Sequence, residues 1–168
     1  VAGLSSTSTR IRQDSASTLA RAKFLAQLNR AERWQCLEAL GQNLQAEDRV
    51  TMDLLQVAQR LEMKEAVDLL VPHYLTEPTG TLQNVLLETI PALDKSRAVR
   101  RLEESMPTDI QGLKRGIALL SLCDDTAAHR CLDQLSSHRN QVVAAMAQAA
   151  RLETAVTPTS RTSFKRPT

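Results

Sequence analysis

The chain has 168 residues, of which 42% are hydrophobic and only 2% aromatic, and it contains 5 glycines. This length allows one domain with a real core, and the few glycines and β-branched runs argue against a sheet protein. The net charge of +2 is unevenly placed: residues 1–13 carry +2, residues 156–168 carry +3 and residues 14–155 carry −3. A body of that charge disfavours a general nucleic-acid surface.

Apolar residues recur every three or four positions along most of the chain, which predicts an all-α protein of about nine helices. We expect residues 1–13 to be a flexible N-terminal leader, because they are rich in Ser and Thr and lack an apolar stripe. Residues 14–155 are predicted to form a helical repeat domain, and residues 156–168 a disordered basic tail. The apolar positions place the helices around residues 19–28, 34–44, 52–61, 66–75, 82–90, 98–106, 110–122, 128–135 and 142–150.

Polar residues at the helix boundaries predict where the chain turns. Residues 94–96 should turn it between two helices, and residues 77–80 (EPTG) are a further break. We expect Thr108 or Asp109 to cap one helix, and Asp124 with Asp125 to cap the helix that follows them. Asp14, Ser15 or Ser17 is the expected cap of the first helix.

A spaced pair of residues, a small one followed four positions later by Leu, recurs along the chain. The small residues of successive pairs are separated by 30, 32 and 30 residues, and another apolar residue lies eight positions before each of them. This period of about thirty residues, with two helices in each, is typical of a helical repeat array in which stacked hairpins bury one another. The pairs are Cys36/Leu40, Ala66/Leu70, Ala98/Leu102 and Ala128/Leu132, and the preceding apolar residues are Leu28, Ala58, Ile90 and Leu120.

These residues resemble the short HEAT-like repeats of bacteria over roughly residues 17–153, most clearly over residues 118–152. There a helix ends before an acidic turn, an Ala-x3-Leu helix follows, and Arg139 precedes a helix rich in Val and Ala. Pro91 stands late in a first helix, where such repeats often carry a proline, whereas Leu122 and Cys123 replace the usual glycine before the turn. The resemblance implies a right-handed α-solenoid of stacked helical hairpins that binds partners, and it names neither a partner nor a reaction.

No motif in the sequence points to catalysis, a cofactor or a metal. His129 and His138 lie nine residues apart, and only Cys131 and the Asp124–Asp125 pair could join them, too few for an expected zinc site. We therefore predict that the protein is not an enzyme. The cysteines at positions 36, 123 and 131 are interpreted as buried reduced thiols, although Cys123 and Cys131 could approach one another across the turn.

The candidate binding residues lie on second helices of the hairpins, which line one face of a repeat array. Arg97, Arg100, Arg101, Arg130 and Gln134 are the predicted partner contacts, with a solvated face balanced by acids as the alternative. Trp34, the only tryptophan, is expected to pack in the core or between repeats. If exposed, it would be a prime contact residue.

The predicted function is a non-enzymatic protein–protein interaction module, scaffold or adaptor whose partner is another protein with an acidic segment. The alternative is a nucleic-acid-binding helical protein that uses the basic stripe and tails. No apolar run is long enough to span a bilayer, and no signal-peptide core is present, so a cytoplasmic location is expected. Because the chain begins with Val1, we expect either a processed product or a piece of a longer protein.

Overall fold

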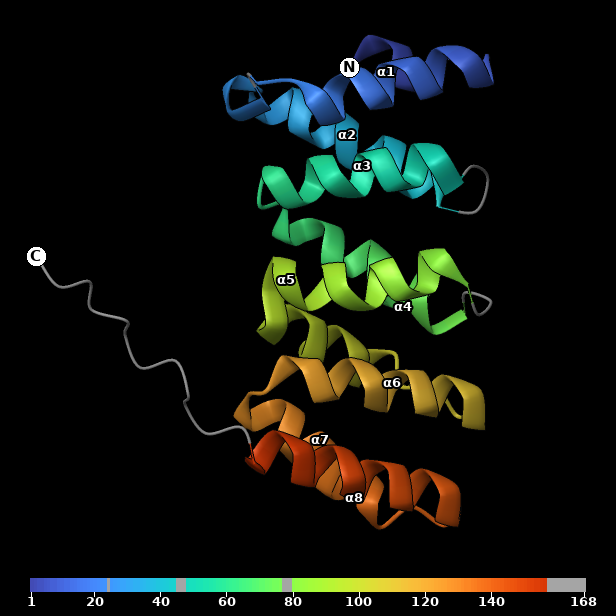
Figure 1. Cartoon of the computed structure of the whole chain (residues 1–168), viewed down its shortest axis with the longest axis vertical. Coiled ribbons are helices and arrows are strands. Elements are labelled where there is room, and N and C mark those ends of the chain that lie inside the picture. The colour runs from blue at the N-terminus through green and yellow to red at the C-terminus, as the bar shows by residue number, and fades with distance from the viewer. Residues whose placement is uncertain (24, 45–47, 77–79, 157–168) are drawn as a thin grey trace, which may run out of the picture. The chain divides into compact units, whose positions relative to one another are not determined.

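The computed structural model describes residues 1–23, 25–44, 48–76 and 80–156, and within these ranges every regular element is a helix. The all-α prediction is confirmed (Figure 1). The chain divides into two compact units, Val1–Ser105 and Met106–Thr168. The first holds η1 (Ala2–Ser5), α1 (Thr9–Arg21), η2 (Leu25–Gln27), α2 (Arg30–Asn43), α3 (Asp48–Arg60), η3 (Lys64–Ala66), α4 (Val67–Thr76) and α5 (Thr81–Glu104), and the second holds α6 (Ile110–Cys123), α7 (Thr126–Ser136) and α8 (Gln141–Val156).

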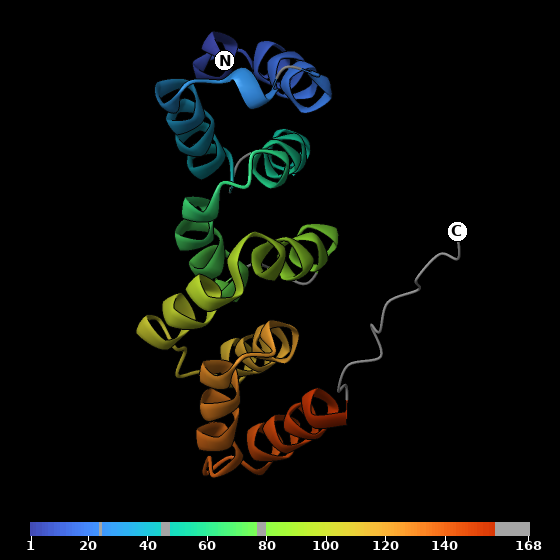
Figure 2. The ribbon, with the colours of Figure 1, turned by 90° about the vertical axis from the view of Figure 1, so that its left-hand side faces the viewer.

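Within the first unit the helices form two layers (Figure 2). One layer contains α1, α3 and the first part of α5, which contact one another in that order. The other contains α2, α4 and the last part of α5. Successive hairpins are also linked by polar side chains, since Gln59 Nε2 donates a hydrogen bond of 2.9 Å to Thr89 Oγ1. Each hairpin of this unit therefore lies beside the next.

The residues that define the thirty-residue period are buried, as predicted. Ala66, Ala98 and Ala128 are 0 to 1% exposed, and the leucines that follow them are fully buried. Of the twelve defining positions, eleven are buried and only Leu28, in the first period, is half-buried. The spacing read from the sequence thus identifies core positions in both units.

α5 is interrupted at Asp94, where the sequence predicts a turn. Asp94 has φ −165° and ψ 105°, which is not helical. Its Oδ1 accepts a hydrogen bond of 2.9 Å from the Arg97 backbone N–H, so it caps the helical segment that follows. The described residues contain eight α-helices, and counting α5 as two segments gives the nine that were expected.

The N-terminal residues differ from the expected flexible leader of residues 1–13. Leu4 is 1% exposed and η1 packs against α1 and α2. α1 already begins at Thr9, so none of Asp14, Ser15 and Ser17 is its cap. Besides the burial of Leu4, a hydrogen bond of 2.6 Å from Arg12 Nη1 to the Ser6 carbonyl holds this segment to α1.

α1 also ends earlier than expected, and a residue from another helix caps its carbonyl end. Ala22 is extended with ψ 129°, which stops the helix at Arg21. The Arg60 guanidinium of α3 donates one hydrogen bond to the Ala20 carbonyl and another, of 2.9 Å, to the Ala22 carbonyl. A cation at the carbonyl end of a helix is favourable both as a donor and as a charge. Phe24, residues 77–79 and the tail from residue 157, all subjects of predictions, lie outside the described residues.

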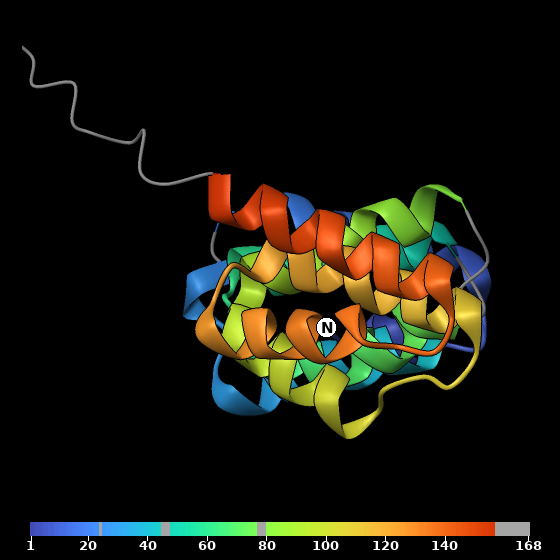
Figure 3. The same cartoon turned by 90° about the horizontal axis from the view of Figure 1, so that it is seen from below.

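The second unit is a bundle of three helices, with α7 and α8 side by side and α6 contacting both (Figure 3). Its turns follow the sequence closely. Asp109 caps α6 by accepting from Gly112 N–H at 2.8 Å, and Asp125 caps α7 by accepting from Ala128 N–H at 2.7 Å. Asp124 takes the left-handed conformation, φ 42°, between α6 and α7.

The three cysteines, all within the described ranges, are buried, and none forms a disulfide. Burial raises the pKa of the Cys36 thiol. No helix in the described part of the chain is both long and apolar enough to cross a bilayer.

One ion pair ties α4 to the last part of α5. The Arg97 guanidinium meets the Asp68 carboxylate through Nε–Oδ1 at 2.9 Å and Nη2–Oδ2 at 2.5 Å. The hydrogen bonds from Arg97 lower the pKa of Asp68, and those same bonds raise the pKa of Arg97. Such two-point contact between guanidinium and carboxylate is the strongest form of an ion pair near a surface.

We predict opposite effects for one substitution at two helical glycines. A methyl group added at Gly112 would lie 2.8 Å from both Pro107 Cγ and Asp109 Oδ2, whereas at Gly41 the nearest atom is Leu69 Cδ1 at 3.5 Å. Gly112→Ala should therefore destabilise the second unit by about 1–3 kcal/mol. Gly41→Ala should stabilise the first by about 0.5–1 kcal/mol. Urea unfolding followed by circular dichroism measures both, and equal shifts in the same direction would contradict the packing described at Gly112.

A second prediction concerns the acid dependence of the Asp68–Arg97 pair. Because folding lowers the pKa of Asp68 below its ordinary value of 3.8, the pair stabilises the fold above that pH and loses this effect as the pH falls further. Asp68→Asn should reduce the free energy of unfolding by about 0.5–1 kcal/mol at pH 7, a modest value because the carboxylate is partly exposed. The difference from the wild type should shrink as the pH falls below 3.8 and vanish once the pH is below the lowered pKa of Asp68. Glu38→Gln, at another exposed acid, is the matched control, and a difference that persists in acid would refute the assignment.

Candidate functional site

The predicted basic residues of the first unit lie on the last part of α5. The Arg97 side chain forms the ion pair with Asp68 described above, and Arg101 Nη1 lies 3.1 Å from Glu104 Oε2. Arg100 is exposed, and neighbouring Glu103 and Glu104 are exposed as well. Two of the three predicted arginines thus have acidic partners, which weakens this surface as a strongly positive patch.

The other two predicted contacts belong to the second unit. Arg130 and Gln134 are both exposed and lie four residues apart on α7, so they share one face of that helix. No hydrogen bond or ion pair engages either side chain within the described residues. Their role as contacts stays a prediction.

A pocket of the first unit lies at the start of α2, beside Trp34. It has a volume of about 550 Å³, within the range of small-ligand and peptide-anchoring sites. Trp34 is 64% exposed, so the expectation that it packs in the core or between repeats is wrong. The pocket is lined by Leu28, Arg30, Arg33, Trp34, Leu37, Leu61, Glu62, Met63 and Glu65.

Local structure on the α2 side fixes the orientation of Trp34. Asn29 and Glu32 form a capping box, with hydrogen bonds of 3.0 and 2.9 Å between each side chain and the other residue's N–H. α2 then turns Cys36 inward, which leaves Trp34, two positions earlier and on the opposite face of the helix, toward solvent. Arg33 Nε donates to the Leu28 carbonyl at 3.2 Å and joins the preceding loop to this wall.

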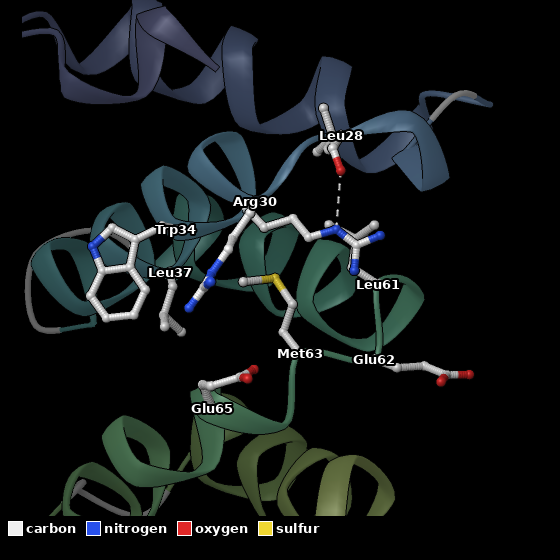
Figure 4. Close-up of a pocket in the computed structure, with 9 residues that line it drawn as sticks. Leu28, Arg30, Trp34, Leu37, Leu61, Glu62, Met63 and Glu65 are labelled. Atoms are coloured by element: carbon white, nitrogen blue, oxygen red, sulfur yellow. Dashed lines mark hydrogen bonds between the residues drawn. The ribbon is translucent and has the colours of Figure 1, made fainter.

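The opposite side of the pocket is the turn between α3 and η3. Glu62 has φ 50°, a left-handed conformation that reverses the chain, and Met63 N–H donates to the Ala58 carbonyl at 2.9 Å. Figure 4 shows Met63 between the two segments, with Trp34 and Leu37 on one side and Glu65 of η3 on the other. The pocket therefore has apolar walls from two successive hairpins.

The rim of the pocket carries charges of both signs. Arg30 and Arg33 come from α2, and Glu62 and Glu65 come from the opposite turn. In the described part of the chain, the side chains of Arg30, Glu62 and Glu65 and the Trp34 indole N–H have no ion-pair or hydrogen-bond partner. An apolar hollow beside an exposed indole, surrounded by available polar groups, suits contact with a protein segment.

One row of side chains in the second unit has the order of a hydrolytic triad, but its hydrogen bonds are structural. His129 Nε2 lies 3.4 Å from Asp124 Oδ1, and its Nδ1 lies 3.4 Å from Thr154 Oγ1. The Thr154 hydroxyl donates instead to the Arg151 carbonyl at 3.0 Å, one turn earlier in α8. The row links the α6–α7 turn to α8. Among the described residues, no three His, Cys, Asp or Glu side chains gather as metal ligands would.

The sequence matches no model of a known protein family, and no curated protein has significant similarity to it.

Proposed function

We propose that this chain is a non-enzymatic helical-repeat module, a scaffold or adaptor that binds another protein, and that the pocket beside Trp34 is its principal contact site. The exposure of Trp34 is the observation that carries this proposal. Tryptophan is strongly enriched among residues that dominate binding energy, and an exposed tryptophan beside a hollow of about 550 Å³ is an uncommon feature of a surface without a partner.

The repeat architecture is part of the same proposal. The thirty-residue period is buried at eleven of its twelve defining positions, and the hairpins of the first unit lie in two layers. This arrangement supports a short HEAT-like α-solenoid, a fold whose exposed helical faces suit partner binding. Further contacts are proposed separately for each unit: Arg97, Arg100 and Arg101 in the first, where Arg100 is exposed, and Arg130 and Gln134 in the second, where both are exposed. Buried thiols at all three cysteines suit a reducing compartment such as the cytoplasm.

The alternative, a nucleic-acid-binding protein, has less support. Asp68 and Glu104 each hold one of the predicted arginines, so fewer cations are available to phosphates. Among the described residues, Trp34 is the one exposed aromatic side chain, and a single strand requires several such stacking platforms.

We predict that Trp34→Ala removes most of the partner binding and leaves the fold intact. Loss of a dominant contact should lower affinity at least about 30-fold, whereas an exposed side chain contributes little to folding. Quantitative affinity purification from the source cells, with the chain as bait, measures the recovery of each bound protein. Ile110→Ala is the matched control, because it shortens another exposed apolar residue, 45% exposed, in the second unit.

Circular dichroism and thermal unfolding of both variants verify that they are folded. Proteins enriched on the wild type and on Ile110→Ala but lost from Trp34→Ala would support the proposal. Equal recovery on all three baits would remove the Trp34 pocket as the contact site.

A further inference from the structure

The outer face of α8 carries an apolar stripe that no helix of the second unit covers. Val142 is 53% exposed and Leu152 is 67% exposed, and Ala145 and Ala149 between them are exposed as well. The inner face, with Val143, Ala147 and Ala150, is buried where α8 packs on α6 and α7 (Figure 3). α8 is therefore apolar on two opposite sides, and only one side has a partner.

The residues of the outer stripe follow each other at steps of three, four and three positions. This is the spacing of the seam along which one helix packs against another in a coiled coil. We propose that the α8 stripe, defined as Val142, Ala145, Ala149 and Leu152, pairs antiparallel with the same stripe of a second copy of the chain. The proposal is independent of the function assigned to the Trp34 pocket.

The order of side-chain sizes in the α8 stripe makes it complementary to itself. Val142 and Leu152 are equally distant from residue 147, and so are Ala145 and Ala149. A two-fold axis at that level places Val142 opposite the second copy's Leu152 and Ala145 opposite the second copy's Ala149. Large residues then meet at both ends, and small residues meet in the middle, where they let the helices approach closely. A two-fold interface requires this reciprocity of contacts.

The charges around the stripe favour the same arrangement. Residues 140–150 contain no charged residue, so two copies can approach there without repulsion. Arg139 and Glu153 are exposed at opposite ends of the stripe. Antiparallel pairing places the two Arg139 side chains at opposite ends of the interface, whereas parallel pairing would place these like charges together. Arg151 is held by Asp133 of its own chain at 2.9 Å and adds no unbalanced charge.

The size of the stripe sets the strength of the pairing. One helical face covers less than the ~800 Å² per partner of a standard stable interface, so the dimer should be weak and should dissociate on dilution. Analytical ultracentrifugation of the full chain, from micromolar to submillimolar concentrations, measures this equilibrium directly.

Three variants test the geometry. Ala145→Glu places two like charges within the seam and should abolish the dimer. Ala145→Glu combined with Ala149→Lys should restore it, because in the antiparallel pair each Glu faces a Lys of the other copy. Ala92→Glu, the same substitution at an exposed helical position of α5, is the matched control and should dimerise like the wild type. Thermal unfolding followed by circular dichroism verifies that each variant is folded.

Each result decides the matter. A concentration-dependent dimer lost only in Ala145→Glu and regained in the double variant would support the proposal. A wild type that stays monomeric at submillimolar concentration would overturn it, as would a dimer that Ala145→Glu leaves unchanged. A double variant as monomeric as Ala145→Glu would exclude the antiparallel arrangement.

Discussion

The close approach of helices at small buried residues is the constraint on which both units depend. Two helices can pack with their axes about 8–10 Å apart only where the side chains at the crossing leave room. Ala58, Ala66 and Ala98 in the first unit, and Ala128 in the second, are almost fully buried. In the second helices a fully buried leucine follows four residues after Ala66, Ala98 and Ala128. A core built in this way needs hardly any aromatic residue, which accounts for the composition.

Polar side chains reinforce this apolar seam from one hairpin to the next. Gln59 bonds to Thr89 and Asp68 to Arg97, so the partners are 30 and 29 residues apart, about one period of the repeat. Arg60 reaches back further, to the carbonyl groups at the end of α1. These bonds fix neighbouring hairpins in register, because a directional contact tolerates less sliding than packed aliphatic groups do. Arg97, which the sequence suggests as a binding residue, thus stabilises the fold through its ion pair with Asp68.

The sequence was informative where local chemistry determines structure. Helix boundaries at Asp94, Asp109 and Asp125 were predictable, because a carboxylate that caps a helix acts on N–H groups only three residues away. The buried positions of the thirty-residue period were also predictable from local pattern, because helical spacing places them on one face of each helix. Local pattern was sufficient for most of the fold.

Features that depend on distant residues were missed or misread. Arg60, 38 residues after Ala22, caps the end of α1, and the burial of Leu4 depends on how α1 and α2 are placed. Trp34 lies three positions from buried Leu37 but two from buried Cys36, so helical spacing alone allowed either side. The role of Arg97 could not be read because its partner is in the preceding hairpin. The sequence showed that Trp34 would be a prime contact residue if it were exposed. It predicted neither the exposure of Trp34 nor the pocket beside it.

The buried cysteines can report how often the structure around them opens. A thiol inside a helix core reacts with an alkylating reagent only during the moments when the surrounding structure opens. Cys36 lies in the first unit and Cys123 with Cys131 in the second. The alkylation rate of Cys36 can be compared with the rates of Cys123 and Cys131 in mild denaturant. Different rates would indicate two units that open independently, and equal rates a chain that opens as a whole.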